Sequence, residues 1–245
     1  MGLNAAFMSA AAVVLAFAVM AAGSCVQGAV GFGASLIAAP FLVLIDERFV
    51  PGPITAASIF LNIVFLATRR DVTVDGQIRW AIGGLVPGTI AGGVVLGVVS
   101  ADGLSVVFAV LVIVAVALSL SGLHPPRRPR SLAVAGVASG LMGTISGIGG
   151  PPIALVYQHE PATMLRGTLP RFFLAGSTLA IVAIALAGRF GVEEAELSVV
   201  LAAGALAGLS LSAPVARHLD ERSARPVVLT LSVLAAIAVL LRELI

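Results

Sequence analysis

Charged residues are scarce in this chain, and their scarcity excludes most soluble folds. Only 11% of the 245 residues are Asp, Glu, Lys or Arg, whereas a soluble domain carries about 25%. Hydrophobic residues make up 59% of the chain, and its mean hydropathy is +1.12. Such a chain has too few polar side chains to cover a surface that faces water. We therefore expect an integral membrane protein.

Cysteine is almost absent and lysine is missing altogether. The one cysteine, Cys25, excludes an internal disulfide and a metal site built from several cysteines. All 14 basic residues are arginines, and they form no basic patch, so nucleic acid is not an expected partner. The three histidines fall in expected loops without the spacing of metal ligands. The sequence therefore predicts neither a metal site nor a cofactor.

Long apolar runs occupy most of the chain. A membrane-spanning helix needs about 20 apolar residues, and ten apolar segments are present. They cover approximately residues 7–27, 33–45, 54–68, 81–99, 104–121, 131–146, 150–158, 172–187, 197–213 and 227–241. The segments 33–45 and 150–158 are too short to span upright, and each follows a long helix after a glycine-rich break. We interpret each long-plus-short pair as a hairpin within the membrane of an all-α polytopic protein.

The arginines indicate the orientation, because arginine and lysine are enriched in cytoplasmic loops. If both hairpins return the chain to the side from which it entered, the outer loops hold Arg48, Arg189 and Arg242. The loops on the other side hold Arg69, Arg70, Arg79, Arg127, Arg128, Arg130, Arg166, Arg171, Arg217, Arg222 and Arg225. The second group is assigned to the cytoplasm. We expect a multi-pass protein of the bacterial cytoplasmic (inner) membrane with both termini outside.

The sequence repeats at an offset of 116 residues. Gly31-Phe32-Gly33 then falls on Gly147-Ile148-Gly149, and the stretch 88–92 falls on 204–208. Each half has five segments, an odd number, so the second copy must be inverted. We predict a first repeat over 1–121, a cytoplasmic Pro/Arg linker over 122–130 and a second, inverted repeat over 131–245. Secondary transporters with such halves bind their substrate near the midplane, at the repeat interface.

Each half contains one glycine-rich break, at 27–35 and at 143–152. Backbone in hydrocarbon leaves the helix only where protein or a water-filled cavity satisfies it. In the second break, Gly149-Gly150 followed by Pro151-Pro152 predicts a helix start, because proline fits the first helical turn. A helix N-terminus carries roughly +0.5 of a charge and free N–H donors. Two such ends facing each other predict a pocket for a small anion.

Close helix packing is the alternative role for glycine. It remains an alternative at the two breaks. It is the favoured interpretation for Gly84, Gly88 and Gly92, and for Gly204 and Gly208.

The glycine motifs resemble those of one known family. "QGAVGFGASLIAAP", "GLMGTISGIGGPPIALVY", "WAIGGLVPGTIAGGVVLG", "LAAGALAGLSLSAPVARHLD" and "RGTLPRFFLAGS" resemble stretches of the TauE/SafE family of bacterial sulfite exporters. The resemblance covers nearly the whole chain and implies export of sulfite, sulfoacetate or a related organosulfur anion. The glycines that match the family pattern are Gly31, Gly33, Gly147, Gly149 and Gly150. Ala34 stands where the first motif usually has another glycine.

The predicted substrate-binding residues lie in or beside the two breaks. They are Gln27, Gly31, Gly33, Ser35, Asn62, Ser146, Gly147, Gly149, Gly150, Arg171 and Thr178. Asn62 and Thr178 coincide at the 116-residue offset, and a hydrogen bond between helices is the alternative role of each. Arg171 follows the second break, and its alternative role is to enforce orientation.

No Asp, Glu or Arg lies at the centre of any segment, so a proton relay has no candidate. We expect a non-enzymatic exporter of a small sulfur or organosulfur anion, driven by the membrane potential. Another small anion such as a carboxylate, or a metal cation, is the alternative substrate. An intramembrane enzyme would need a nucleophile–base pair that the sequence lacks, and a scaffold would not need paired breaks. The expected partners are the anion and the lipid bilayer, and a homodimer is one assembly that the sequence allows.

Overall fold

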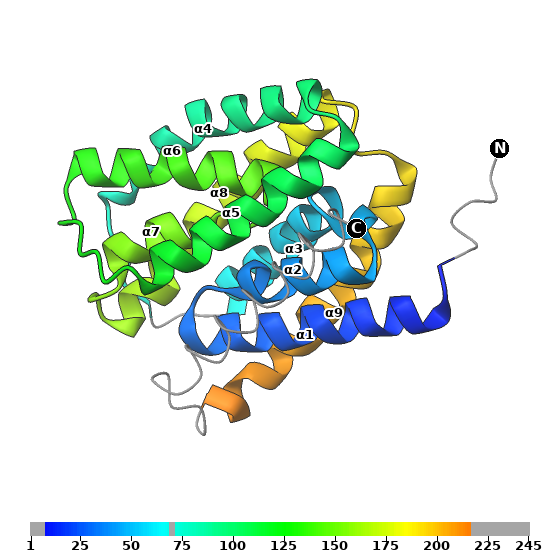
Figure 1. Cartoon of the computed structure of the whole chain (residues 1–245). Coiled ribbons are helices and arrows are strands. Elements are labelled where there is room, and N and C mark those ends of the chain that lie inside the picture. The colour runs from blue at the N-terminus through cyan, green and yellow to red at the C-terminus, as the bar shows by residue number, and fades with distance from the viewer. Residues whose placement is uncertain (1–7, 69–71, 217–245) are drawn as a thin grey trace.

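The computed structural model describes residues 8–68 and 72–216. Within these ranges the chain forms nine α-helices and one short 3-10 helix and contains no β-strand (Figure 1). The predicted all-helical class is therefore confirmed. The last expected segment, 227–241, lies outside the described residues.

The helices follow the predicted apolar segments in order. The first half contains α1 (Ala10–Val30), α2 (Ala34–Ile45), the 3-10 helix η2 (Glu47–Phe49), α3 (Gly52–Thr68), α4 (Ile78–Val98) and α5 (Ala101–Leu120). The second contains α6 (Pro129–Ser146), α7 (Gly150–Tyr157), α8 (Ala162–Leu186) and α9 (Val192–Ala216). Five of these helices, α1, α4, α5, α8 and α9, are long and apolar enough to cross a membrane. The chain is a multi-pass membrane protein.

Several helices begin earlier than their apolar segments. α8 begins at Ala162 although its expected segment begins at 172, and α9 begins at Val192 although its segment begins at 197. The added turns contain arginines in α8 and glutamates in α9, which a search for apolar runs passes over. α6 begins at Pro129, inside the expected linker, because proline is favoured in a first helical turn.

Glycine-lined contacts join the two halves. α4 packs along α6, and α1 packs along α9, at opposite sides of the bundle (Figure 1). A Cβ atom at Gly84 or Gly88 would collide with the carbonyl of Ala133 or Val137 on α6. On the other side, a Cβ atom at Gly204 would lie 2.6 Å from the carbonyl oxygen of Phe17 on α1. The packing role expected of these glycines is confirmed.

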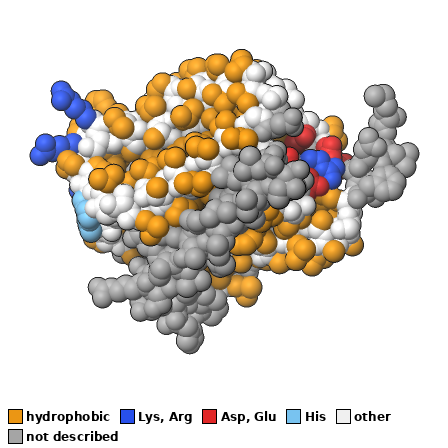
Figure 2. Space-filling model, viewed as in Figure 1, with side chains coloured by type: hydrophobic (Ala, Val, Ile, Leu, Met, Phe, Trp, Pro, Cys, Tyr) orange, Lys and Arg blue, Asp and Glu red, His pale blue; other side chains and the backbone are white. Residues whose placement is uncertain are grey.

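The bundle surrounds a middle layer of α3 and α8, which pack against each other. The short helices lie beside the long helices that precede them, α2 against α1 and α7 against α6. Many large apolar side chains point outward, among them Val98 (76% exposed), Val134 (69%) and Leu186 (84%). Figure 2 shows such side chains over the middle of the visible face, with charged side chains gathered at its two ends. This surface suits a lipid bilayer.

The contact between α4 and α6 gives a test of the packing. Gly88→Ala places a methyl group against the backbone of Val137, so the two helices must move apart. Overpacking of this kind lowers stability by about 1–3 kcal/mol. We expect a lower midpoint of thermal unfolding in detergent, followed by tryptophan fluorescence or light scattering.

Gly97→Ala is the matched control on the same helix, because a Cβ atom there meets nothing within 4 Å. It should leave the midpoint unchanged or raise it, since alanine is the better helix former. Equal midpoints for the two variants would contradict the packing described here.

Candidate functional site

Both glycine breaks line one cavity between the helices. Its volume is about 70 Å³, which is room for more than one water at roughly 10–15 Å³ each in this measure. The first break contributes Gln27, Phe32, Gly33 and Ser35 to its wall. The second break contributes Gly143, Thr144, Gly147, Gly149, Gly150 and Pro151. Side chains of α3 and α8 complete the enclosure, so segments far apart in the sequence meet at one place.

The first break reverses the chain through two glycines. Gly31 and Gly33 have φ angles of +106° and +111°, in the region that favours glycine. The Gly31 amide donates to the Gln27 carbonyl at 2.7 Å and ends α1. The Ala34 amide donates to Gln27 Oε1 at 3.2 Å, so the Gln27 side chain takes one free donor of α2. Gln27 Nε2 donates to Asn62 Oδ1 at 3.3 Å and connects the break to α3.

The second break begins α7 with almost no capping. Gly147 ends α6 with φ +72°, and its amide donates to the Gly143 carbonyl at 2.9 Å. Pro151 and Pro152 have no N–H, so they offer no donors to the cavity. The amides of Gly149 and Gly150, like that of Ser35 at the first break, have no protein acceptor among the described residues.

Seven of the eleven predicted substrate-binding residues lie on the cavity wall. They are Gln27, Gly33, Ser35, Asn62, Gly147, Gly149 and Gly150. The assignment of these residues to a substrate stays a prediction.

The other four predicted residues do not line the cavity. Gly31 lies against Arg166 of α8. The Ser146 hydroxyl donates to the Met142 carbonyl at 2.8 Å and is buried. Arg171 is exposed and donates to the Gly167 carbonyl. Thr178 is also exposed, and its hydroxyl donates to the Leu174 carbonyl at 2.8 Å. Its neighbour Ser177 lines the cavity instead.

The cavity residues that were not predicted include Thr55 on α3 and Ser139 on α6. Both are buried, at 4% and 2% exposure, and neither hydroxyl has a hydrogen-bond partner. Thr55 lies three residues before Ser58 and seven before Asn62, so the three share one face of α3. The helical spacing of polar side chains therefore contained a signal for Thr55.

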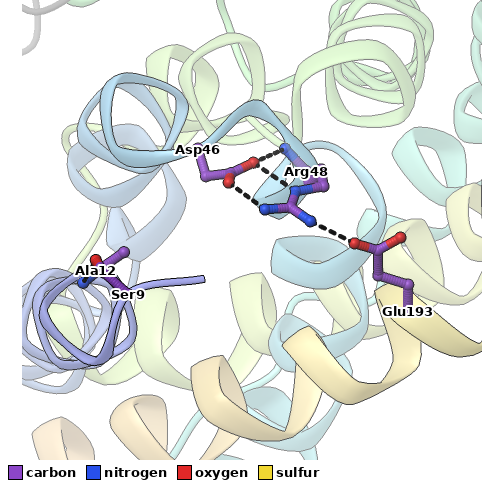
Figure 3. A network of polar contacts seen from close by, with 5 residues as sticks. All are labelled: Ser9, Ala12, Asp46, Arg48 and Glu193. Carbon is purple, nitrogen blue, oxygen red and sulfur yellow. Dashed lines mark hydrogen bonds and ion pairs between the residues drawn. The ribbon is translucent and has the colours of Figure 1, made fainter. Parts of the chain in front are cut away.

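The wall of the central cavity is neutral. None of the described residues that line it is charged. At one end of the bundle, Arg48 pairs with Asp46 at 2.7 Å and with Glu193 at 2.6 Å (Figure 3). Ser9, which caps α1, lies near the same end. We call this the Arg48 end.

The opposite end carries a second ion-pair network. Arg127 pairs with Asp75 at 2.8 Å and with Glu160 at 2.9 Å, and the Tyr157 hydroxyl donates to Asp75 at 2.8 Å. We call this the Arg127 end. The 25 residues of α8 separate the two ends by about 37 Å. His124 and His159 stack nearby with ring centroids 4.7 Å apart, while His218 lies outside the described residues.

A larger cavity, about 400 Å³, opens at the Arg48 end. Its wall includes Arg48, Arg189 and Glu194. Ile145 lines this cavity, and its neighbour Thr144 lines the central one. The two cavities therefore meet α6 at consecutive residues.

Comparison with known proteins gives one match. A family model described as Sulfite exporter TauE/SafE matches residues 15–239. The matched range includes both glycine breaks and every helix from α2 to α9. No curated protein and no solved structure matches the chain.

The Asp75 carboxyl links stability to pH. Burial raises its pKa, but hydrogen bonds from the Gln77 amide, the Tyr157 hydroxyl and Arg127 outweigh burial and hold the pKa below its ordinary value of 3.8. A carboxyl whose folded pKa is depressed stabilises the protein above its unfolded pKa and loses this effect as the pH falls. We expect the wild-type unfolding midpoint to fall on acidification below about pH 4.

Asp75→Asn should lower the midpoint at neutral pH, by the equivalent of about 1–3 kcal/mol, because Arg127 and Tyr157 lose their acceptor. It should also reduce the fall of the unfolding midpoint on acidification. Glu196→Gln, a neutralising change at an exposed glutamate, is the control and should do neither. Identical pH profiles for Asp75→Asn and wild type would contradict the role given to Asp75.

Proposed function

The chain belongs to the TauE/SafE family of sulfite exporters, and we propose that it exports a small sulfur or organosulfur anion, such as sulfite or a sulfonate. The members of this family are membrane transporters and not enzymes. The substrate would bind in the central cavity, at the N-termini of α2 and α7. The same chemistry would accept a small carboxylate, which is the second candidate substrate.

The observation that carries this proposal is the meeting of both breaks at one cavity. Ser35, Gly149 and Gly150 line that cavity, and their amides have no protein acceptor among the described residues. Free N–H groups at helix N-termini bind anions, and the helix dipole adds to the attraction. A metal cation would need carboxylate, imidazole or thiolate ligands, and the described residues contain no cluster of them.

Helix positions support an inverted repeat. α1 ends at Val30 and α6 at Ser146, while α2 begins at Ala34 and α7 at Gly150. Each pair is 116 residues apart. The reciprocal packing of α1 with α9 and of α4 with α6 is the pattern that two copies related by a pseudo-two-fold axis would produce.

The glycine contacts refine the alignment of the repeat. Gly84 meets Ala133, and Gly204 meets Phe17, which is the residue 116 positions before Ala133. If these two contacts correspond to each other in the repeat, Gly84 corresponds to Gly204, which lies 120 residues later and not 116. The alignment of α4 with α9 is then shifted by four residues, about one helical turn, from the gapless 116-residue alignment.

We place the protein in the bacterial inner membrane on the basis of its arginines. With the Arg127 end in the cytoplasm, the Arg48 end and both termini face outward, as the positive-inside rule favours. In this proposal the first repeat occupies residues 1–121 and the second repeat occupies residues 131–245.

The membrane potential would drive export. Moving one charge through 100 mV is worth about 2.3 kcal/mol, so a monovalent anion would accumulate outside by about fortyfold, at tenfold per 1.4 kcal/mol. We expect sulfite efflux from proteoliposomes to follow an imposed inside-negative potential set with valinomycin. Efflux indifferent to that potential but strictly tied to a pH gradient would overturn potential-driven export.

A matched pair of variants tests whether sulfite efflux depends on the second glycine break. Gly149→Ala puts a Cβ atom 2.8 Å from the Ser139 carbonyl oxygen at the cavity wall and should reduce efflux. Gly83→Ala, at an exposed position where a Cβ atom meets nothing within 4 Å, should preserve it. Parallel assays with acetate and with divalent cations separate the alternative substrates.

A further inference from the structure

The central cavity is lined by neutral polar groups, and most of their hydrogen atoms are already used. The Ser58 hydroxyl donates to the Ile54 carbonyl and the Thr144 hydroxyl to the Gly140 carbonyl, each at 2.8 Å. Asn62 Nδ2 donates to the Ser58 carbonyl at 2.7 Å. These side chains are held by their own helices and have little left to offer a ligand.

Thr55 and Ser139 differ from the other polar residues of the wall. Both residues are more than nine-tenths buried and line the same cavity, and their hydroxyls have no partner. Buried hydroxyls without a partner are rare in folded proteins, because an unpaired buried donor costs about 1–3 kcal/mol. A ligand that accepts hydrogen bonds would remove this cost. The two unused donors therefore point to such a ligand.

Both hydroxyl residues adjoin the second break. A Cβ atom built on Gly147 would lie 3.9 Å from Thr55 Oγ1. A Cβ atom built on Gly149 would lie 2.8 Å from the Ser139 carbonyl oxygen. The unpaired amides of Gly149 and Gly150 belong to the same turn. Thr55 approaches from α3 and Ser139 from α6, so side-chain and backbone donors converge from different elements.

The charge available to a ligand is small. No arginine or histidine among the described residues lines the cavity. Two helix N-termini at roughly +0.5 each supply about one positive charge. The desolvation penalty of an ion grows with the square of its charge, so a dianion meets about four times the penalty of a monoanion. The cavity can balance one negative charge but not two.

We propose that Thr55 and Ser139 are the side-chain donors of the anion site and that the site selects singly charged oxyanions over doubly charged ones. This inference rests on the proposed function and specifies its substrate class. A sulfonate headgroup has one charge and three acceptor oxygens, which fits two hydroxyls and two amides. Sulfate has a similar shape but carries two charges.

The experiment measures uptake of radiolabelled sulfite by proteoliposomes that contain the full chain, at a mildly acidic pH where the singly charged form, hydrogensulfite, predominates. Methanesulfonate should compete with sulfite, and sulfate at equal concentration should not. Thr55→Val and Ser139→Ala, which preserve side-chain size, should each weaken methanesulfonate competition by about tenfold or more, since hydrogen bonds to charged groups are the strong class.

Thr89→Val and Ser24→Ala are the matched controls. Thr89 and Ser24 are also buried hydroxyls without partners, but they do not line the cavity. In both control variants, methanesulfonate should compete with sulfite as it does in the wild type, and sulfite transport should be unchanged. Unfolding midpoints check that all four variants fold.

Sulfate competing as well as methanesulfonate would overturn the charge selectivity, and losses no greater than in the controls would overturn the roles of Thr55 and Ser139. In either case sulfite transport itself would stand. A wild-type protein that moves no anion would remove the proposed function, and this inference with it.

Discussion

The structure depends on the rule that backbone in hydrocarbon must be hydrogen-bonded by protein or by water in a cavity. Two helices stop within the bundle, at Gly31 and Gly147, and each stop is closed by an amide that donates back to the preceding turn. The first amide of α2 is taken by the Gln27 side chain. The amides that remain open belong to cavity residues. Broken helices and a central cavity are therefore one feature of this fold.

The surrounding bundle keeps the two breaks facing each other. Backbone contacts at Gly88 and Gly208 bring α4 onto α6 and α9 onto α1, so each half is packed against the other. Ion pairs join separate segments at the two ends, Arg48 of η2 to Glu193 of α9 at one and Arg127 to Asp75 at the other. No charged side chain among the described residues lines the cavity, so its donors are uncharged.

Much of this arrangement could be predicted from the sequence because its determinants are local. Gly31 and Gly147 adopt a positive φ, and Pro151-Pro152 starts a helix. A few neighbouring residues are therefore enough to predict where each break lies. The apolar runs indicate the remaining helices. The start of α8 could not be found this way, because arginines and threonines occupy its first turns.

The residues of the cavity wall were harder to predict, since they depend on helix rotation. Asn62 and Thr178 coincide at the predicted 116-residue offset, yet Asn62 lines the cavity while Thr178 is exposed. Arg171 is a charged residue near a break, but it bonds back to its own helix. Thr55 and Ser139 are separated by 84 positions in the chain and are brought to one cavity only by the tertiary fold around the second break. No short-range pattern encodes that meeting.

The central claim is that an anion binds between the two glycine breaks. Its most direct test is an experimentally determined structure with a bromine-labelled sulfonate, such as bromomethanesulfonate, located by the anomalous signal of bromine. We expect a peak in the central cavity, with sulfonate oxygens within hydrogen-bonding distance of the Gly149 and Gly150 amides. A peak confined to the arginines at either end, or an empty central cavity at saturating ligand, would contradict it.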